Sequence, residues 1–111
     1  MKRSYAHDAT LAMAPGEDEH APGAAITTAL CGHWQHEPPC PLAPHYTGAT
    51  RDGDRLRLRI LFAAEESDEP EVRRRIEDAL SAGTRWRLVE AAPSDVTADE
   101  RAHADRLATK G

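Results

Sequence analysis

The residues best suited to chemistry in this sequence are two cysteines and three histidines within one short stretch: Cys31, His33, His36, Cys40 and His45. Thiolate and imidazole groups suit Zn²⁺, which takes four such ligands in a tetrahedral arrangement. Four prolines between residues 38 and 44 stiffen the segment and reduce the entropy lost when its ends come together. We therefore expect one zinc ion at a Cys/His/Pro-rich loop over residues 31–45, held by Cys31, His33, Cys40 and His45.

His36 and Glu37 remain as a spare ligand or as an acid/base group. Four protein ligands close the tetrahedron and favour a structural metal, whereas three ligands and a water would leave the open position of a small zinc-dependent enzyme. The spacing lacks the paired Cys-x2-Cys of a zinc ribbon. Two simpler interpretations therefore stay open: Cys31 and Cys40 are a disulfide or inert thiols, and the histidines are ordinary surface residues.

A second cluster is basic. Arg55, Arg57 and Arg59 alternate along one predicted strand, and Arg85 and Arg87 alternate along another, so each group shares a face. Arginine binds phosphate and stacks on bases, which makes an uncovered sheet face of this kind a candidate nucleic-acid surface. The sequence lacks the aromatic runs of RNA-binding sheets and its net charge is −5. Arginines on a solvated face, paired with acidic residues, are the simpler interpretation.

The chain has 111 residues, enough for one domain, but few of them are large and apolar. Leu, Ile, Val and Phe total 16, which is less than the fifth of the chain that a fully packed domain usually holds. A bound metal would supply stability that burial does not. No apolar run approaches the ~20 residues needed to span a bilayer, and no signal-peptide core follows Met1, so we expect a cytoplasmic protein without membrane contact.

The elements that must position these residues begin with a flexible or loosely attached tail, predicted over residues 1–23 because the stretch has no sustained period. A strand is predicted over 25–30. Asp52-Gly53 suits a tight hairpin turn, and the alternation over 55–60 predicts the strand that follows it. The resulting register pairs His45 with Ile60 and directs His45 to the apolar face.

A helix is predicted after Asp68, with Glu71 three residues later completing a capping box and Gly83 supplying a left-handed stop. Its apolar stripe includes Val72, Ile76 and Leu80. A strand near 84–90 follows, with Trp86 and Leu88 on one face, and a last helix starts at Thr97. If the strands at 55–62 and 84–90 are parallel neighbours, the helix between them makes a right-handed crossover.

These elements predict an α+β fold: a small mixed sheet of about four strands under one helical layer, with residues 24–111 as a single domain. We expect a non-catalytic binding, regulatory or accessory module that holds one zinc ion. A protein partner or a homodimer is expected, because a thin sheet with one uncovered face gains burial by pairing. The alternatives are the small zinc enzyme and, further, a nucleic-acid-binding protein.

Overall fold

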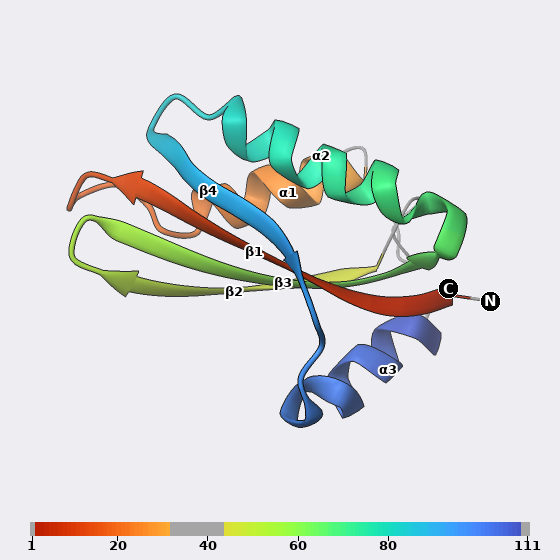
Figure 1. Cartoon of the computed structure of the whole chain (residues 1–111). Coiled ribbons are helices and arrows are strands. Elements are labelled where there is room, and N and C mark those ends of the chain that lie inside the picture. The colour runs from red at the N-terminus through yellow and green to blue at the C-terminus, as the bar shows by residue number, and fades with distance from the viewer. Residues whose placement is uncertain (1, 32–43, 110–111) are drawn as a thin grey trace.

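The computed structural model describes residues 2–31 and 44–109, and Figure 1 shows one twisted sheet with helices on both sides. In chain order the elements are β1 (Lys2–Met13), α1 (Ala21–Cys31), β2 (His45–Asp52), β3 (Arg55–Glu65), α2 (Glu69–Ser81), β4 (Trp86–Ser94) and α3 (Arg101–Thr109), with short 3-10 turns at Glu66–Asp68 and Ala98–Glu100. The strands lie in the order β2-β3-β1-β4. The first six elements form the split βαβ, or ferredoxin-like, arrangement.

The predicted α+β fold with about four strands is confirmed, but the sheet is antiparallel and not mixed. β3 and β4 run in the same direction, as their connection through α2 suggests. They are not neighbours, because β1 lies between them and pairs with both. The condition that these two strands are neighbours is therefore not met, because β1 occupies the place between them.

β1 lies at the centre of the sheet, so the predicted tail is wrong for residues 2–13. Its alternate side chains face the helices, where His7 and Leu11 are fully buried and Met13 is nearly so. The period of two is present in the sequence, but its inward positions include a histidine and an alanine. Because the inward and outward positions therefore differ little in hydrophobicity, the hydrophobicity pattern does not predict this strand.

α1 is a helix where the sequence predicts a strand over residues 25–30. Ile26 and Leu30 are one helical turn apart and both are buried, so the apolar pair fits a period of 3.6 as well as it fits a short strand. Pro22 in the first turn is compatible with a helix start. Cys31 consequently ends a helix and does not follow the predicted strand.

The predicted hairpin of β2 and β3 is present with its register shifted by two residues. Asp52 pairs with Arg55, and the turn consists of Gly53 and Asp54. Gly53 has a positive φ of 62° and Asp54 does not, which is the sign pattern of a type II′ turn. Because side chains alternate with a period of two, a shift of two residues leaves every side chain on its predicted face, and His45 still faces the helices.

α2 buries the predicted stripe of Val72, Ile76 and Leu80. Gly83 does not act as the predicted left-handed stop, since Gly53 is the glycine with positive φ among the described residues. Gly83 instead makes room for Trp86: a Cβ at this position would collide with the indole ring. The indole Nε1 donates to the Leu80 carbonyl at 2.8 Å, which fixes the start of β4 against the end of α2.

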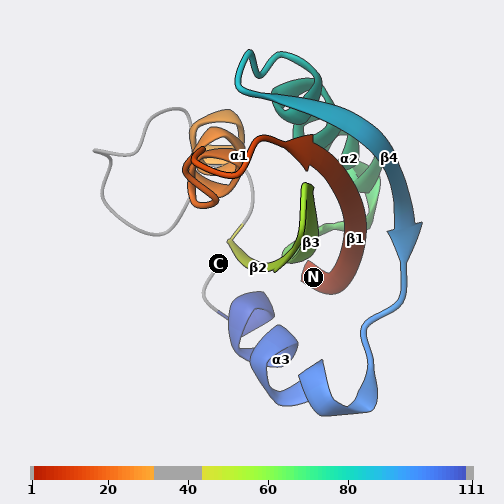
Figure 2. The same cartoon turned by 90° about the vertical axis from the view of Figure 1, so that its left-hand side faces the viewer.

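The two sides of the sheet are covered unequally. α1 and α2 cover one side, and α3 crosses only one end of the other (Figures 1 and 2). At that end Leu107 of α3 packs with Ala6, Leu61 and Ala63. The prediction of a single helical layer is therefore incomplete. Within the described ranges, no helix is long and apolar enough to cross a membrane.

Candidate functional site

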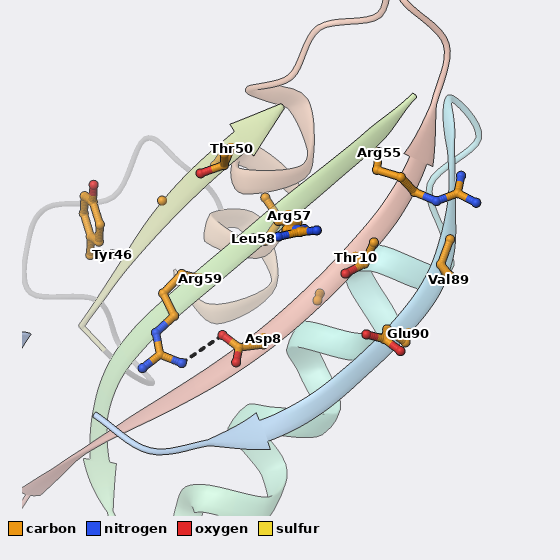
Figure 3. A pocket seen from close by; sticks show the side chains of 13 residues that line it. Asp8, Thr10, Tyr46, Thr50, Arg55, Arg57, Leu58, Arg59, Val89 and Glu90 are labelled. Carbon is orange, nitrogen blue, oxygen red and sulfur yellow. Dashed lines mark hydrogen bonds and ion pairs between the residues drawn. The ribbon is translucent and has the colours of Figure 1, made fainter. Parts of the chain in front are cut away.

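The part of the sheet that α3 leaves uncovered forms a depression of about 960 Å³, which we call the open face (Figure 3). Its floor and walls come from all four strands, and the side chains that define it are Asp8, Thr10, Tyr46, Thr50, Arg55, Arg57, Arg59, Val89 and Glu90. Small residues such as Gly48 lie beneath these side chains, so the depression has room above the sheet. A cavity of this size falls within the range of protein ligand sites.

Strand register sets the pattern of charges on the open face. Arg57 and Glu90 both pair with Thr10, so these three residues form one row across the sheet. In the next row, Arg55 and Arg87 both pair with Ala12. Between the two rows, β4 carries an irregularity in which Val89 is the extra residue, and this bulge leaves Val89 exposed on the open face.

Arg59 joins the open face to α3. Its guanidinium donates to both carboxylate oxygens of Glu100, at 2.7 and 3.0 Å, and to Asp8 Oδ1 at 2.9 Å. It also donates to Ser94 Oγ at 2.6 Å and to the Asp95 carbonyl at 2.5 Å. These bonds lower the pKa of Glu100 to about 2 and raise the pKa of Arg59. All three guanidinium nitrogens of Arg59 are thus hydrogen-bonded within the fold.

Four other charged side chains on this side of the sheet are unpaired. The side chains of Asp52, Arg57, Arg87 and Glu90 form no hydrogen bond or ion pair with the described part of the chain. Their charges are two positive and two negative, so the unpaired charge sums to zero. The predicted arginine face is therefore only partly correct: Arg55 is 3.6 Å from Asp54, and Arg85 lies before β4, 3.8 Å from Glu17.

Exposed apolar side chains line the same depression from its two edge strands. Within residues 2–31 and 44–109, the large apolar side chains that stay exposed are Tyr46 and Val89, and both line the open face. Tyr46 stands at the edge near α3, where its ring packs on His103 with centroids 4.8 Å apart. Unpaired charges around exposed apolar groups in a depression are typical of a binding surface.

The predicted zinc ligands are only partly described. Cys31 is the last residue of α1, while His33, His36, Glu37 and Cys40 lie outside the described residues. His45 begins β2, and its Nε2 lies 3.0 Å from Oγ1 of Thr27, one helical turn before Cys31. Among the residues that are described, no three His, Cys, Asp or Glu side chains come together as a metal site would require. Zinc binding remains a prediction.

A buried histidine was missed by the sequence analysis. His7 of β1 is fully buried against α2, with Nδ1 2.9 Å from Arg73 Nη1 and Nε2 2.9 Å from Glu77 Oε2. An arginine only donates, so Nδ1 accepts and the hydrogen of the neutral ring is on Nε2. Burial lowers the pKa of His7, with Arg73 adding to the effect against the opposing influence of Glu77.

Comparison with models of known protein families finds none that matches the chain, and comparison with curated proteins finds no relative. The fold alone does not identify an activity, because this arrangement of strands and helices serves many functions. A conclusion about function therefore has to come from the geometry of the open face.

Proposed function

We propose that the protein is a non-catalytic binding module and that the open face is its binding surface. One observation carries the proposal: the exposed large apolar residues of the described chain, Tyr46 and Val89, share this depression with unpaired Arg57 and Glu90. Within the described residues, these unpaired charges make no side-chain contact that would stabilise the fold. The same arrangement gives a partner both burial and specific pairing.

The balance of charge indicates what kind of partner fits. A nucleic acid is attracted by a net positive surface, and its binding grows with the number of arginines and lysines free to meet phosphates. Here Arg59 is held by Asp8 and Glu100, and the remaining unpaired charges cancel. These features favour a partner that presents both signs of charge, as a protein does.

The proposal is tested by placing a photo-reactive amino acid at position 89 of the full chain, in the cells that naturally make it. The matched control carries the same group at position 81, because Ser81 is exposed at the end of α2 on the opposite side of the sheet. We expect a discrete crosslinked product from position 89 and not from position 81, and its mass identifies the partner. No product above the control at position 89 would contradict the proposal.

We also propose that the chain holds one zinc ion, now supported by the position of His45. Its contact with Thr27 brings the start of β2 to within one helical turn of Cys31, at the end of α1. Cys31 and His45 thus belong to elements that are in contact, and cysteine and histidine are residues that supply the ligands of structural zinc sites. The small zinc enzyme, with His36 or Glu37 as acid/base group, remains the alternative, and metal analysis is its first test.

A further inference from the structure

We infer that the open face binds a second copy of this chain in a two-fold arrangement, with the axis passing beside Val89. The inference rests on the proposed function and names the partner. A two-fold contact requires a self-complementary surface: a residue away from the axis meets a different residue of the other copy, and that contact is repeated in reverse, while a residue on the axis meets its own equivalent. Four side chains that are unpaired within the described residues satisfy that requirement: Arg57 and Glu90 on the open face, and Asp52 and Arg87 in the neighbouring row of the sheet.

The position of α3 decides how the two copies are oriented. α3 projects from one end of the sheet and packs on Ala6, Leu61 and Ala63 (Figure 1). If both copies placed α3 at the same end, the two helices would occupy the same space between the sheets. The strands of the second copy must therefore run in the opposite direction, so that the two α3 helices lie at opposite ends and the two-fold axis runs across the strands.

This orientation pairs the unpaired charges. An axis across the strands, between the row of Ala12 and the row of Thr10, places β4 over β4 of the second copy. Arg87 then faces Glu90 of the second copy, and Glu90 faces its Arg87. Val89 lies between these two residues and meets its own copy at the axis.

The second pair of charges follows from the same axis. Arg57, in the row of Thr10, is brought opposite the row that holds Arg55 and Asp52 of the second copy. Asp52 is one strand away from Arg55, or about 5 Å, which a flexible arginine can reach. Arg55 keeps its own ion-pair neighbour Asp54. Each of the two arginines that face one another therefore has a carboxylate that offsets its charge.

The open face is small, and this sets the expected strength of the contact. Four strands about 4.8 Å apart and about five residues long give a flat footprint of roughly 300 Å² per copy. The additional surface of protruding side chains is not included in this area. Stable interfaces bury about 800 Å² per partner, so this contact belongs to the weak and reversible class. We expect a monomer–dimer equilibrium with a dissociation constant on the order of 10 µM.

Sedimentation equilibrium of the full chain, its Arg87→Glu variant and its Glu90→Arg variant tests the arrangement. Each variant alone places like charges opposite each other at both symmetric contacts, so each should dimerise at least about tenfold more weakly. An equal mixture restores opposite charges at both contacts and should form heterodimers about as strongly as the wild-type chain dimerises. Arg74→Glu and Asp78→Arg, which change exposed charges on α2, are the matched controls and should leave the dimer unchanged.

Circular dichroism confirms that each variant is folded before its mass is measured. A wild-type chain that stays monomeric at about 100 µM, on the order of ten times the expected constant, overturns the inference. So does a mixture that fails to restore the dimer. If the wild-type chain is monomeric but position 89 crosslinks to another protein, this inference fails while the proposed function holds. If position 89 gives no product and the chain is monomeric, both fail.

Discussion

Replacing Glu100 with glutamine removes one charge from the junction between α3 and the sheet and leaves the shape of the side chain unchanged. Glu100 accepts from Arg59 through both carboxylate oxygens and from the backbone N–H of Thr97 at 3.0 Å, as in a capping box. Glutamine keeps an oxygen for Thr97. Its amide nitrogen then faces Nε of Arg59 and cannot accept, so the Glu100→Gln variant measures the charge of the pair together with one of its hydrogen bonds.

The size of the effect follows from the pKa of Glu100, which falls from 4.5 to about 2, chiefly because of the hydrogen bonds from Arg59. One pKa unit corresponds to about 1.4 kcal/mol, so the shift sets a ceiling of about 3.4 kcal/mol. Both side chains are partly exposed, Arg59 at 28% and Glu100 at 24%. Solvent screening lowers the contribution, and we expect the variant to lose about 1–2 kcal/mol at neutral pH.

Urea unfolding of both proteins between pH 7 and pH 3 provides the measurement. Glu100 has a lowered pKa in the folded chain, so its stabilisation is complete above pH 4.5 and is lost as the pH falls from 4.5 toward 2. The difference between wild type and variant should shrink over that range. Glu71→Gln, which removes an exposed carboxylate on α2, should have a smaller effect. A difference below about 0.3 kcal/mol at pH 7, or one that does not change with pH, would refute the reasoning.

Three further predictions concern other parts of the chain. Gly83→Ala should destabilise the fold by about 1–3 kcal/mol in chemical denaturation, because its methyl group meets the indole of Trp86. The lowered pKa of His7 means that the unfolded chain binds a proton that the folded chain does not. Unfolding free energy should therefore decrease as the pH falls below about 6.5, and this part of the pH dependence should be absent in His7→Gln; equal profiles would contradict the assignment. Protein purified without a histidine tag should contain about one equivalent of zinc, and a chelator or Cys40→Ser should lower its melting temperature, whereas less than about 0.2 equivalents of metal would end the zinc prediction.

The second half of the chain could be predicted from its sequence because its signals are local. The stripe of Val72, Ile76 and Leu80 has helical spacing and no competing pattern, and Thr97 with Glu100 marks the start of the last helix. The β2–β3 hairpin was predicted two residues out of register, since the sequence does not show which pair of residues forms the turn. The predicted face of each side chain is nevertheless correct, because side chains on a strand alternate with a period of two residues.

The first half could not be predicted because its elements depend on the rest of the fold. β1 is held from both sides by β3 and β4, and its inward positions include His7, which is stabilised by contacts with α2. In α1, Ile26 and the two threonines after it favour a strand locally, while burial of Ile26 and Leu30 beside α2 selects the helix.

Part of the arginine cluster could be predicted from alternation alone, whereas its charge balance could not. Alternation places Arg55, Arg57 and Arg59 on one face, and the structure agrees. Which arginines are paired depends on Asp8 and Glu100, which are distant in sequence. The sequence therefore does not separate the internal ion pairs of this face from its unpaired charges, and the structure does.

The photo-crosslinking comparison between positions 89 and 81 tests the central claim most directly, because it reports which surface of the full chain is in contact with a partner. We predict a product from position 89 in severalfold excess over position 81, with a mass of two chains. Placing Arg87→Glu in the same chain should reduce the yield of that product. Equal yields from the two positions would contradict the proposal that the open face is the binding surface.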